Sequence, residues 1–288
     1  SLVIALHGAD AQGNAIDRSA FADATVTVDG TALSAQAAPP TPPMDDAGAG
    51  VASDAGASLS VEAGVSVEGQ FSFAFSADIT GELLSLQFVN DYSASMRDDD
   101  LDIVATIHND ILDVLPSAIY EGEATYFSTE VTVKQPFTDD ESALRSALER
   151  DTSIDRDTTA LYDGMGTGLS SLLTRDRPLK LLIVSTDGLE NASTEFSKAD
   201  IVSLLQQNHV AVLMLGAVFS DVGEMQDLAG PYGVFFYTPA YEDLRAAVAQ
   251  YVESLSNLAL LRLPPEYADA DEIEISVAGE QVSVDPSP

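Results

Sequence analysis

The chain has 288 residues, 47 of them acidic and 12 basic, which gives a formal net charge of −35, and it contains no Cys and no Trp. Because so acidic a surface repels nucleic-acid phosphates and anionic lipids, we expect neither nucleic-acid binding nor direct membrane insertion. The lack of cysteine excludes disulfides, thiolate metal sites and a cysteine nucleophile, and 45% hydrophobic residues are enough for a packed core in one or two domains.

The acidity has two possible explanations. Most of the few basic residues are Arg rather than Lys, and a Lys-poor, Asp-rich surface is a common way of staying soluble at high salt. Alternatively, some of the carboxylates are grouped to hold divalent cations. Total charge does not separate these explanations, so the spacing of the acidic residues has to be considered.

Residues 1–79 show the period-two alternation of half-buried strands. The chain begins at Ser1 and moves directly into this pattern without the charged start and long apolar stretch of a signal peptide, so we interpret it as a processed or trimmed chain. Residues 36–57 are rich in Pro, Gly and Ala and predict a flexible, exposed loop. The expected strands cover residues 2–6, 26–28, 59–61, 65–67 and 71–75.

The β-pattern returns near the end of the chain, at residues 273–284. This tail is too short to bury a sheet face by itself, because an isolated hairpin is marginally stable in water. We therefore predict a discontinuous β-sandwich domain formed by residues 1–79 and 263–288.

Residues 80–262 alternate between strand and helix patterns. Such alternation predicts an α/β domain with a doubly wound, mostly parallel sheet covered by helices on both faces, inserted into the β-sandwich. Thr138, with Glu141 three residues later, predicts a capping box for a helix that runs to Arg150. Strands are expected at residues 83–89, 131–133, 181–184, 210–218 and 234–237, and helices at 101–115, 138–150, 161–172, 197–208, 222–228 and 241–255.

Polar residues follow two of the predicted strands. The strand at 83–89 leads into DYSAS at residues 91–95, and the strand at 181–184 leads into STDG at residues 185–188. Ligands of such a sheet bind beyond the carboxyl ends of its strands. Thr159, in the run TALYD, opens the helix before the second strand. Hydroxyls and two carboxylates form an all-oxygen set that suits a hard cation such as Mg²⁺.

Together, these three segments resemble the von Willebrand factor type A (VWA) domain and its metal-ion-dependent adhesion site (MIDAS), whose motif is Asp-x-Ser-x-Ser followed by a Thr and an Asp from two later loops. The resemblance covers about residues 82–260 and implies the doubly wound α/β fold. It also implies Mg²⁺ as the bound cation, with Mn²⁺ or Ca²⁺ as alternatives. The implied metal ligands are Asp91, Ser93, Ser95, Thr159 and Asp187.

The continuation of the motif, MRDD at residues 96–99, resembles the A-like domain of integrin beta subunits, which is likewise inserted into a β-sandwich. This resemblance implies that Asp98 and Asp99 are ligands of an adjacent Ca²⁺ site. An alternative is that Asp98, Asp99 and Asp100 only place negative charge at the start of the following helix, where the helix dipole favours it.

The resemblance implies binding rather than catalysis, so we expect no enzymatic activity. A cation held mainly by neutral hydroxyls keeps positive charge and an open position, which an Asp or Glu of a protein partner can fill. We expect a secreted or cell-surface adhesion module, of a kind found in bacteria. The alternatives are an intracellular assembly factor that docks on an ATPase partner and, last, a metal-dependent hydrolase with Asp187 as base, for which the sequence offers no nucleophile.

Two further features carry no function in this interpretation. The three histidines, His7, His108 and His209, are dispersed and lack the spacing of metal ligands or of a catalytic triad, so we expect core or surface roles. The run GMGTG at residues 164–168 lacks the Lys of a phosphate-binding loop and lies inside a helix pattern, so we expect it to let that helix pack closely on the sheet.

Overall fold

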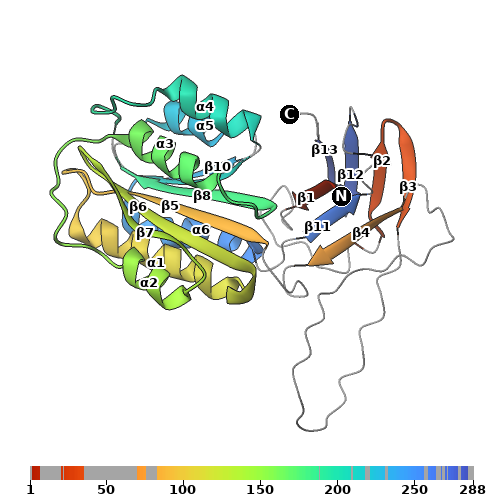
Figure 1. Cartoon of the computed structure of the whole chain (residues 1–288), viewed down its shortest axis with the longest axis horizontal. Helices are drawn as coiled ribbons and strands as arrows, with labels where there is room; N and C mark the ends of the chain where they lie inside the picture. The colour runs from red at the N-terminus through yellow and green to blue at the C-terminus, as the bar shows by residue number, and fades with distance from the viewer. Residues whose placement is uncertain are drawn as a thin grey trace, which may run out of the picture.

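The computed structural model contains an α/β part and an all-β part, which are seen side by side in Figure 1. The residues that the structure describes are 2–6, 21, 23–35, 70–75, 83–187, 189–208, 210–217, 221–230, 233–255, 259–263, 267, 270, 272–277 and 280–284. The predicted loop at 36–57 and the strands expected around 59–67 lie outside these residues. In the described parts of the chain, no helix combines the length and apolar character needed to cross a membrane.

The α/β part is built on a six-stranded sheet with the order β10-β9-β8-β5-β6-β7. All neighbouring strands are parallel except β6 and β7, which are antiparallel. The predicted doubly wound, mostly parallel sheet is therefore confirmed. Its strands are β5 (Leu84–Asp91), β6 (Tyr120–Phe127), β7 (Val131–Thr138), β8 (Leu179–Thr186), β9 (Ala211–Ala217) and β10 (Gly233–Thr238).

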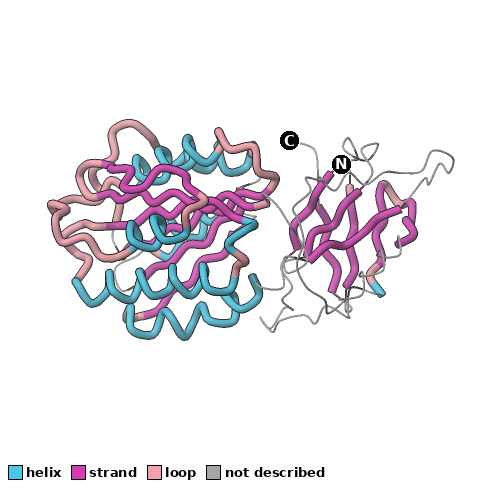
Figure 2. Tube along the Cα trace, turned by 60° about the horizontal axis from the view of Figure 1, so that its bottom comes forward, coloured by secondary structure: helices cyan, strands magenta, loops and turns pink. Residues whose placement is uncertain are grey.

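Among the described residues, six α-helices cover the two faces of this sheet, with α1, α2 and α6 on one face and α3, α4 and α5 on the other (Figures 1 and 2). A short 3-10 helix, Ser117–Ile119, precedes β6. The α-helices are α1 (Asp98–Val114), α2 (Glu141–Leu148), α3 (Leu161–Leu172), α4 (Lys198–Gln207), α5 (Val222–Ala229) and α6 (Tyr241–Leu255).

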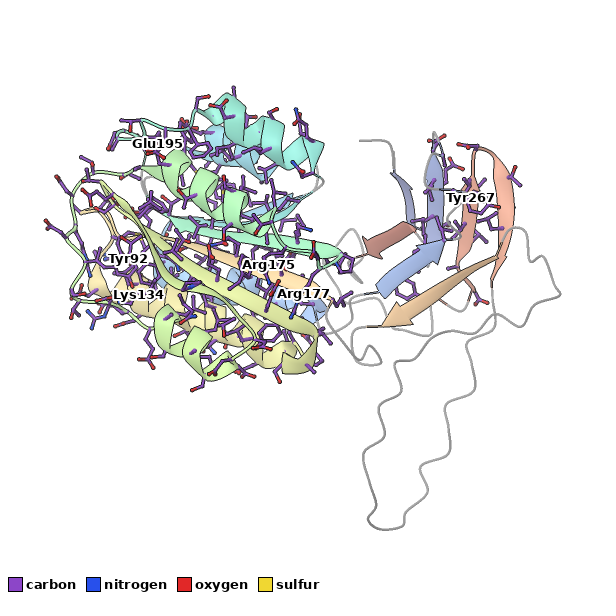
Figure 3. All side chains as sticks on the ribbon, viewed as in Figure 1. Tyr92, Lys134, Arg175, Arg177, Glu195 and Tyr267 are labelled. Carbon is purple, nitrogen blue, oxygen red and sulfur yellow. The ribbon has the colours of Figure 1, made fainter. Side chains whose placement is uncertain are left out.

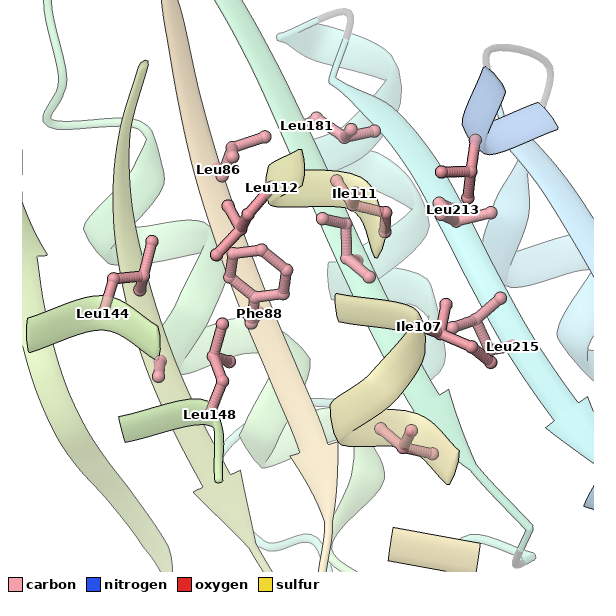
Figure 4. Packing of buried hydrophobic residues seen from close by; sticks show 14 of the residues in the cluster. Leu86, Phe88, Ile107, Ile111, Leu112, Leu144, Leu148, Leu181, Leu213 and Leu215 are labelled. Atoms are coloured by element: carbon pink, nitrogen blue, oxygen red, sulfur yellow. The ribbon is translucent and has the colours of Figure 1, made fainter. Parts of the chain in front are cut away.

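Each face of the sheet has its own apolar core. On the α1 face, Leu86 and Phe88 of β5 pack against Ile107 and Ile111 of α1 (Figure 4), and all four side chains are fully buried. The other face buries a second cluster that includes Val89, the neighbour of Phe88 on β5. Because β5 is buried on both faces, its end at Asp91 is held firmly between two packed layers.

The glycines of α3 allow this helix to lie unusually close to the sheet, which confirms the interpretation of GMGTG. A Cβ atom on Gly168 would come within 2.8 Å of Val89 Cγ2, and one on Gly164 would come within 2.7 Å of Phe127 Cδ1. Distances this short do not occur between real carbon atoms, so larger residues would push α3 away from β5 and β6.

The all-β part combines strands from both ends of the chain in the order β1-β11-β4-β3-β2-β12-β13. Antiparallel pairing joins β1 to β11, β11 to β4 and β2 to β12, so the N-terminal and C-terminal segments share one hydrogen-bonded arrangement. The prediction of two facing sheets, a sandwich, stays a prediction. The strands are β1 (Leu2–Leu6), β2 (Thr25–Val28), β3 (Thr31–Ala35), β4 (Gln70–Phe75), β11 (Ala259–Leu263), β12 (Ile273–Val277) and β13 (Glu280–Val284).

Several local features differ from the sequence predictions. Strands β3, β6 and β11 were not expected, and β11 already belongs to the all-β part from Ala259 on. The predicted capping box was wrong, because α2 begins at Glu141 with Asp140 as its N-cap, whose side chain accepts a hydrogen bond from the backbone N of Ala143. Thr138 instead ends β7.

Candidate metal centre

The candidate site lies where the order of the strands in the sheet reverses. From β5 the chain continues to β6 and β7 on one side, and β8, β9 and β10 follow on the other side. The carboxyl ends of the neighbouring strands β5 and β8 therefore form the switch point at which open α/β sheets bind ligands. Asp91 is the last residue of β5, and Asp187 directly follows β8.

Asp91 is completely buried, and both of its carboxylate oxygens are occupied. Its Oδ1 accepts a hydrogen bond of 2.7 Å from the backbone N of Ser93, and its Oδ2 accepts one of 2.6 Å from Oγ1 of Thr186. The first bond folds the DYSAS segment back over the end of its own strand, and the second ties β5 to β8. These bonds fix the orientation of the carboxylate.

Ser93, Ser95 and Asp187 form a continuous hydrogen-bonded chain. The Oγ atoms of Ser93 and Ser95 are 3.0 Å apart, and Oγ of Ser95 donates to Oδ1 of Asp187 at 2.7 Å. Ser93 and Asp187 are buried, whereas Ser95 is exposed, so the chain leads from the protein interior to the surface. Four predicted ligands thus meet at one edge of the sheet. Asp91 joins this chain through its hydrogen bond with the backbone N of Ser93.

Thr159, the fifth predicted ligand, reaches the same edge on a separate loop. The backbone N of Ala94, inside the DYSAS segment, donates to the carbonyl of Asp157, which places the segment before Thr159 against the motif loop. Asn191, in the loop after β8, holds Thr159 through two hydrogen bonds: its side-chain oxygen accepts from the Thr159 N, and its backbone N donates to the Thr159 carbonyl. Thr159 is buried.

The two carboxylates lie in an environment that disfavours their negative charge. Burial raises the pKa of Asp91 to about 6, against the hydrogen bonds from Thr186 and Ser93, and the charge of Asp187 raises it further. Burial likewise raises the pKa of Asp187. A divalent cation would compensate two such carboxylates, and the surrounding hydroxyls are the ligands that a hard cation takes. The residues present therefore fit a MIDAS cation.

Other metal-binding clusters are not apparent in the described ranges. No group of three or more His, Cys, Asp or Glu side chains that could hold a metal ion occurs there. The candidate set does not meet that criterion because only two of its five members are carboxylates. The other three members are neutral hydroxyls, which add no negative charge to that of the two carboxylates.

Asp98 and Asp99 have a different setting from the second cation site suggested by the integrin resemblance. Both oxygens of Asp98 are engaged by guanidinium groups, Oδ1 by Arg156 at 2.7 Å and Oδ2 by Arg150 at 2.9 Å. Asp99 is exposed in the first turn of α1, where negative charge is favourable. This setting favours the alternative, in which these carboxylates place negative charge at the start of α1, and the adjacent Ca²⁺ site stays a prediction.

Several residues that support the site were not found from the sequence. Thr186 donates to Asp91, and Asn191 positions Thr159. Asp163, in the first turn of α3, accepts hydrogen bonds from three successive backbone N–H groups of the loop after β8, those of residues 194–196. Asp163 lies inside the recognised run TALYD, so the motif contained it, whereas nothing in the sequence indicates the partners of Thr186 and Asn191.

A second buried polar cluster lies far from this site. Glu121 of β6 accepts hydrogen bonds from Ser85 at 2.7 Å and from two guanidinium nitrogens of Arg175 at 2.8 and 2.7 Å. Figure 3 shows Arg175 and Arg177 at the end of the α/β part opposite to Tyr92, the neighbour of Asp91. Paired in this way, the buried carboxylate contributes to the structure rather than to the metal centre.

Histidine does not contribute to the metal centre in the described part of the chain. His108 is fully buried on α1, with its ring edge against Phe88 at a centroid distance of 4.9 Å. Burial lowers the pKa of His108 to about 3, so the ring is neutral at physiological pH. A place in the core is one of the two roles expected for His108. His7 and His209 lie outside the described residues.

Solved structures with a similar fold come from several organisms. Proximal thread matrix protein 1 from the mussel byssus, in a structure with a zinc-occupied MIDAS motif, is 19% identical with a TM-score of 0.56, and the match covers 67% of this chain and 50% of that chain. A von Willebrand factor type A protein from Catenulispora acidiphila is 16% identical with a TM-score of 0.49, over 61% of this chain and 43% of that chain. This chain thus spans about half the length of the mussel protein.

At the level of sequence, no curated protein matches the chain. The family model of the von Willebrand factor type A domain, however, matches residues 86–250, which is more than half of the chain and includes the carboxyl ends of the five parallel strands β5, β6, β8, β9 and β10. The match contains all five predicted ligand positions. The chain therefore belongs to the von Willebrand factor type A domain family, a family of protein-interaction modules.

Proposed function

We propose that this chain is a divalent-cation-dependent protein-binding module, whose MIDAS cation takes up an Asp or Glu side chain of a partner protein. The ligands of the cation are Asp91, Ser93, Ser95, Thr159 and Asp187. No reaction is catalysed at this site, because the cation serves as the contact between two proteins.

One observation carries this proposal: the hydrogen-bonded chain of Ser93, Ser95 and Asp187 at the switch point, beside the buried carboxylate of Asp91. The hydroxyls already lie within hydrogen-bond distance of one another and of a carboxylate, so their oxygens converge on a small volume. The chain ends at the surface with Ser95, where a partner can reach the cation. Oxygen ligands of this kind suit Mg²⁺ and Mn²⁺.

The charge of the donors explains why an acidic partner is the expected one. The two carboxylates near the ion carry no more negative charge than a divalent ion carries positive charge. One of them, Asp91, is fully buried and already uses both oxygens in hydrogen bonds, so the ion can still accept a carboxylate from a partner. The chain as a whole carries a net charge of −35 and would repel an acidic surface. The cation supplies a local positive charge that reverses this repulsion at one point.

Arg97 adds a second positive group near the site. It follows the DYSAS segment by two residues, and its side chain is 64% exposed. Two hydrogen bonds to the carboxylate of Asp100, of 2.8 and 2.7 Å, hold the guanidinium in place. A partner carboxylate that approaches the cation therefore meets a positioned guanidinium group as well.

The proposal is tested by calorimetric titration of Mg²⁺, Mn²⁺, Ca²⁺ and Zn²⁺ into the chelator-stripped full chain. Zn²⁺ is included because the mussel protein similar in fold has zinc at its MIDAS. We expect one site per chain, and at 100 times the dissociation constant the ion should stabilise the fold by about 2.7 kcal/mol.

Two substitutions that remove the same charge distinguish a specific site from general acidity. Asp187→Asn should abolish the calorimetric site, whereas Asp155→Asn, an exposed residue in the loop before Thr159, should leave it unchanged. Equal weak, salt-sensitive binding in both variants would mean that the acidity is only a solvated surface, and it would refute the proposal.

The partner class is tested with a pair of short peptides that differ only in one Asp-to-Asn exchange. NMR titration of the Mn²⁺-free, Mg²⁺-loaded chain should show shifts for the Asp peptide that vanish when a chelator is added, and none for the Asn peptide. Binding of both peptides, or binding that survives the chelator, would exclude a carboxylate contact through the cation.

A further inference from the structure

The side chain of Tyr241, the first residue of α6, is completely buried, and its hydroxyl has no hydrogen-bond partner among the described residues. An unpartnered buried hydroxyl costs folding free energy, and most buried polar groups in proteins are satisfied by protein or ordered water. The position of Tyr241 in the fold suggests why a hydroxyl is kept there in spite of this cost.

Tyr241 stands at the same edge of the sheet as the metal centre. It follows the carboxyl end of β10, and its neighbour Glu242 lies close to the DYSAS segment, with Oε2 of Glu242 3.9 Å from Nη2 of Arg97. Helices α1 and α6 also pack side by side in one buried cluster, which contains both Leu101 and Leu244. The first turn of α6 is thus adjacent to the loop that carries Ser93 and Ser95.

The phenol lies within electrostatic range of the carboxylates of this edge. Burial holds the pKa of Tyr241 well above its ordinary value, and after burial the negative charges of Asp187, Asp91 and Asp100 raise it further. The hydroxyl therefore stays protonated at physiological pH, and it remains a hydrogen-bond donor in the neighbourhood of these acceptors.

We propose that Tyr241 is a positioning residue of the metal centre, whose hydroxyl, once the cation is bound, donates to a buried water held between the phenol and the carboxylates of Asp91 and Asp187. This inference rests on the proposed function. A buried water needs two to four polar partners, and this edge offers them. Outer-shell hydrogen bonds of this kind orient the ligands of a metal, so the start of α6 becomes linked to the cation.

The inference predicts opposite effects of one substitution on the metal-free and the metal-bound chain. In Tyr241→Phe the ring still fills its place in the core, but the hydroxyl is gone. The metal-free chain loses only an unsatisfied group, so its melting temperature should stay the same or rise. The cation site loses a positioning donor, so its affinity should fall by about 10-fold or more.

The experiment compares the full chain with Tyr241→Phe and with the control Tyr120→Phe. Tyr120 is also buried, but it begins β6, which runs parallel to β5, and so lies at the opposite end of the sheet from Asp91. Mn²⁺ titration by calorimetry should give about a 10-fold weaker site in Tyr241→Phe and an unchanged site in Tyr120→Phe.

A spectroscopic readout separates positioning from loss of stability. The chain has no Trp, so its near-ultraviolet spectrum comes mainly from its 9 Tyr residues. Addition of Mn²⁺ should produce a tyrosine difference spectrum in the unsubstituted chain and in Tyr120→Phe, and this signal should be missing in Tyr241→Phe.

The outcomes distinguish this inference from the proposed function on which it rests. If the unsubstituted chain binds no cation, both are overturned. If it binds Mn²⁺ and Tyr241→Phe binds equally well with the same difference spectrum, only the role of Tyr241 is overturned. A lowered melting temperature of metal-free Tyr241→Phe would also overturn it, because the hydroxyl would then already have a stabilising partner.

Discussion

Thr186 on β8 donates its hydroxyl to the carboxylate of Asp91 on β5, with 2.6 Å between Oγ1 and Oδ2, and both residues are fully buried. This bond opposes burial, which raises the pKa of Asp91 to about 6. The charge state of the most deeply buried predicted metal ligand thus depends on a residue of the neighbouring strand. Thr186 lies just before Asp187 and connects the two acidic ends of the site.

We therefore expect Thr186→Val to weaken cation binding although Thr186 is not itself a predicted ligand. Valine keeps the shape but loses the donor, so the pKa of Asp91 rises further and its carboxylate is less often charged at pH 7. The affinity for Mn²⁺, measured by calorimetry, should fall by about 10-fold or more, and the free energy of unfolding should fall by about 1–3 kcal/mol.

Ser185→Ala is the matched control for this substitution. Oγ of Ser185 donates to Asn90 at 2.9 Å, between the same two strands but one residue earlier, where side chains point to the other face of the sheet. It removes a buried hydrogen bond without touching Asp91. If both variants bind Mn²⁺ like the unsubstituted chain, Thr186 has no influence on the site.

The raised pKa of Asp91 predicts a specific pH dependence of stability in the presence of chelator. Between its ordinary value of 3.8 and about 6, the folded chain holds a proton that the unfolded chain has released. The stability contributed by this group is therefore complete below pH 3.8 and is lost as the pH rises through 6, by up to about 3 kcal/mol.

The measurement is the difference in unfolding free energy between the unsubstituted chain and Asp91→Asn from pH 3.5 to 7.5, obtained by urea titration at roughly half-unit pH intervals. The unsubstituted chain should lose stability relative to the variant as the pH rises. Saturating Mn²⁺ should cancel this loss, because the cation binds the charged carboxylate. Two parallel curves in chelator would contradict the assigned shift.

The predicted ligands at the strand ends could be found from the sequence because each directly follows a recognisable apolar strand. The run DYSAS follows a strongly apolar strand, and Asp187 follows another, so parallel topology alone brings the two together at the switch point. Thr186 and Tyr241 could not be predicted as parts of the site. Their importance depends on which side chain faces Asp91 across the sheet, which is a tertiary property.

The missed strand β6 illustrates the same limit for the fold. All eight of its residues are buried, yet Glu121 and Glu123 interrupt its apolar pattern. Glu121 is buried because Arg175 pairs with it, and Glu123 because Ser171 donates to it at 2.7 Å. These partners lie about 50 residues away in the sequence. The local sequence pattern alone therefore predicts a solvent-exposed segment where the structure has a buried strand.

His108 should make the chain sensitive to acid. Burial lowers its pKa from 6.5 to about 3, so between these values the unfolded chain binds a proton that the folded chain does not. Stability is therefore complete above pH 6.5 and is lost as the pH falls toward 3, by up to about 5 kcal/mol.

The variant His108→Leu isolates this effect, because it fills a similar volume without a titrating group or the two unpartnered ring nitrogens. Relative to it, the unsubstituted chain should become less stable as the pH is lowered, as measured by urea unfolding at several pH values. This slope is opposite in sign to that of Asp91, so only differences from each variant separate the two groups. No change in the difference between pH 7 and 4 would be inconsistent with a buried neutral His108.

The close contact between α3 and β5 gives the last prediction. A Cβ atom at Gly168 would lie 2.8 Å from Val89 Cγ2 and 3.0 Å from Gln87 Cγ, so Gly168→Ala should lower the free energy of unfolding by about 1–3 kcal/mol in urea titration. Gly223→Ala on α5 is the control, because the nearest atom to its new Cβ would be Oδ1 of Asp221 at 3.5 Å. There the better helix propensity of Ala should raise stability by up to about 1 kcal/mol. If both variants gained stability equally, the prediction would be contradicted, because the contact between α3 and β5, the strand that ends in Asp91, would then leave room for a Cβ atom at residue 168.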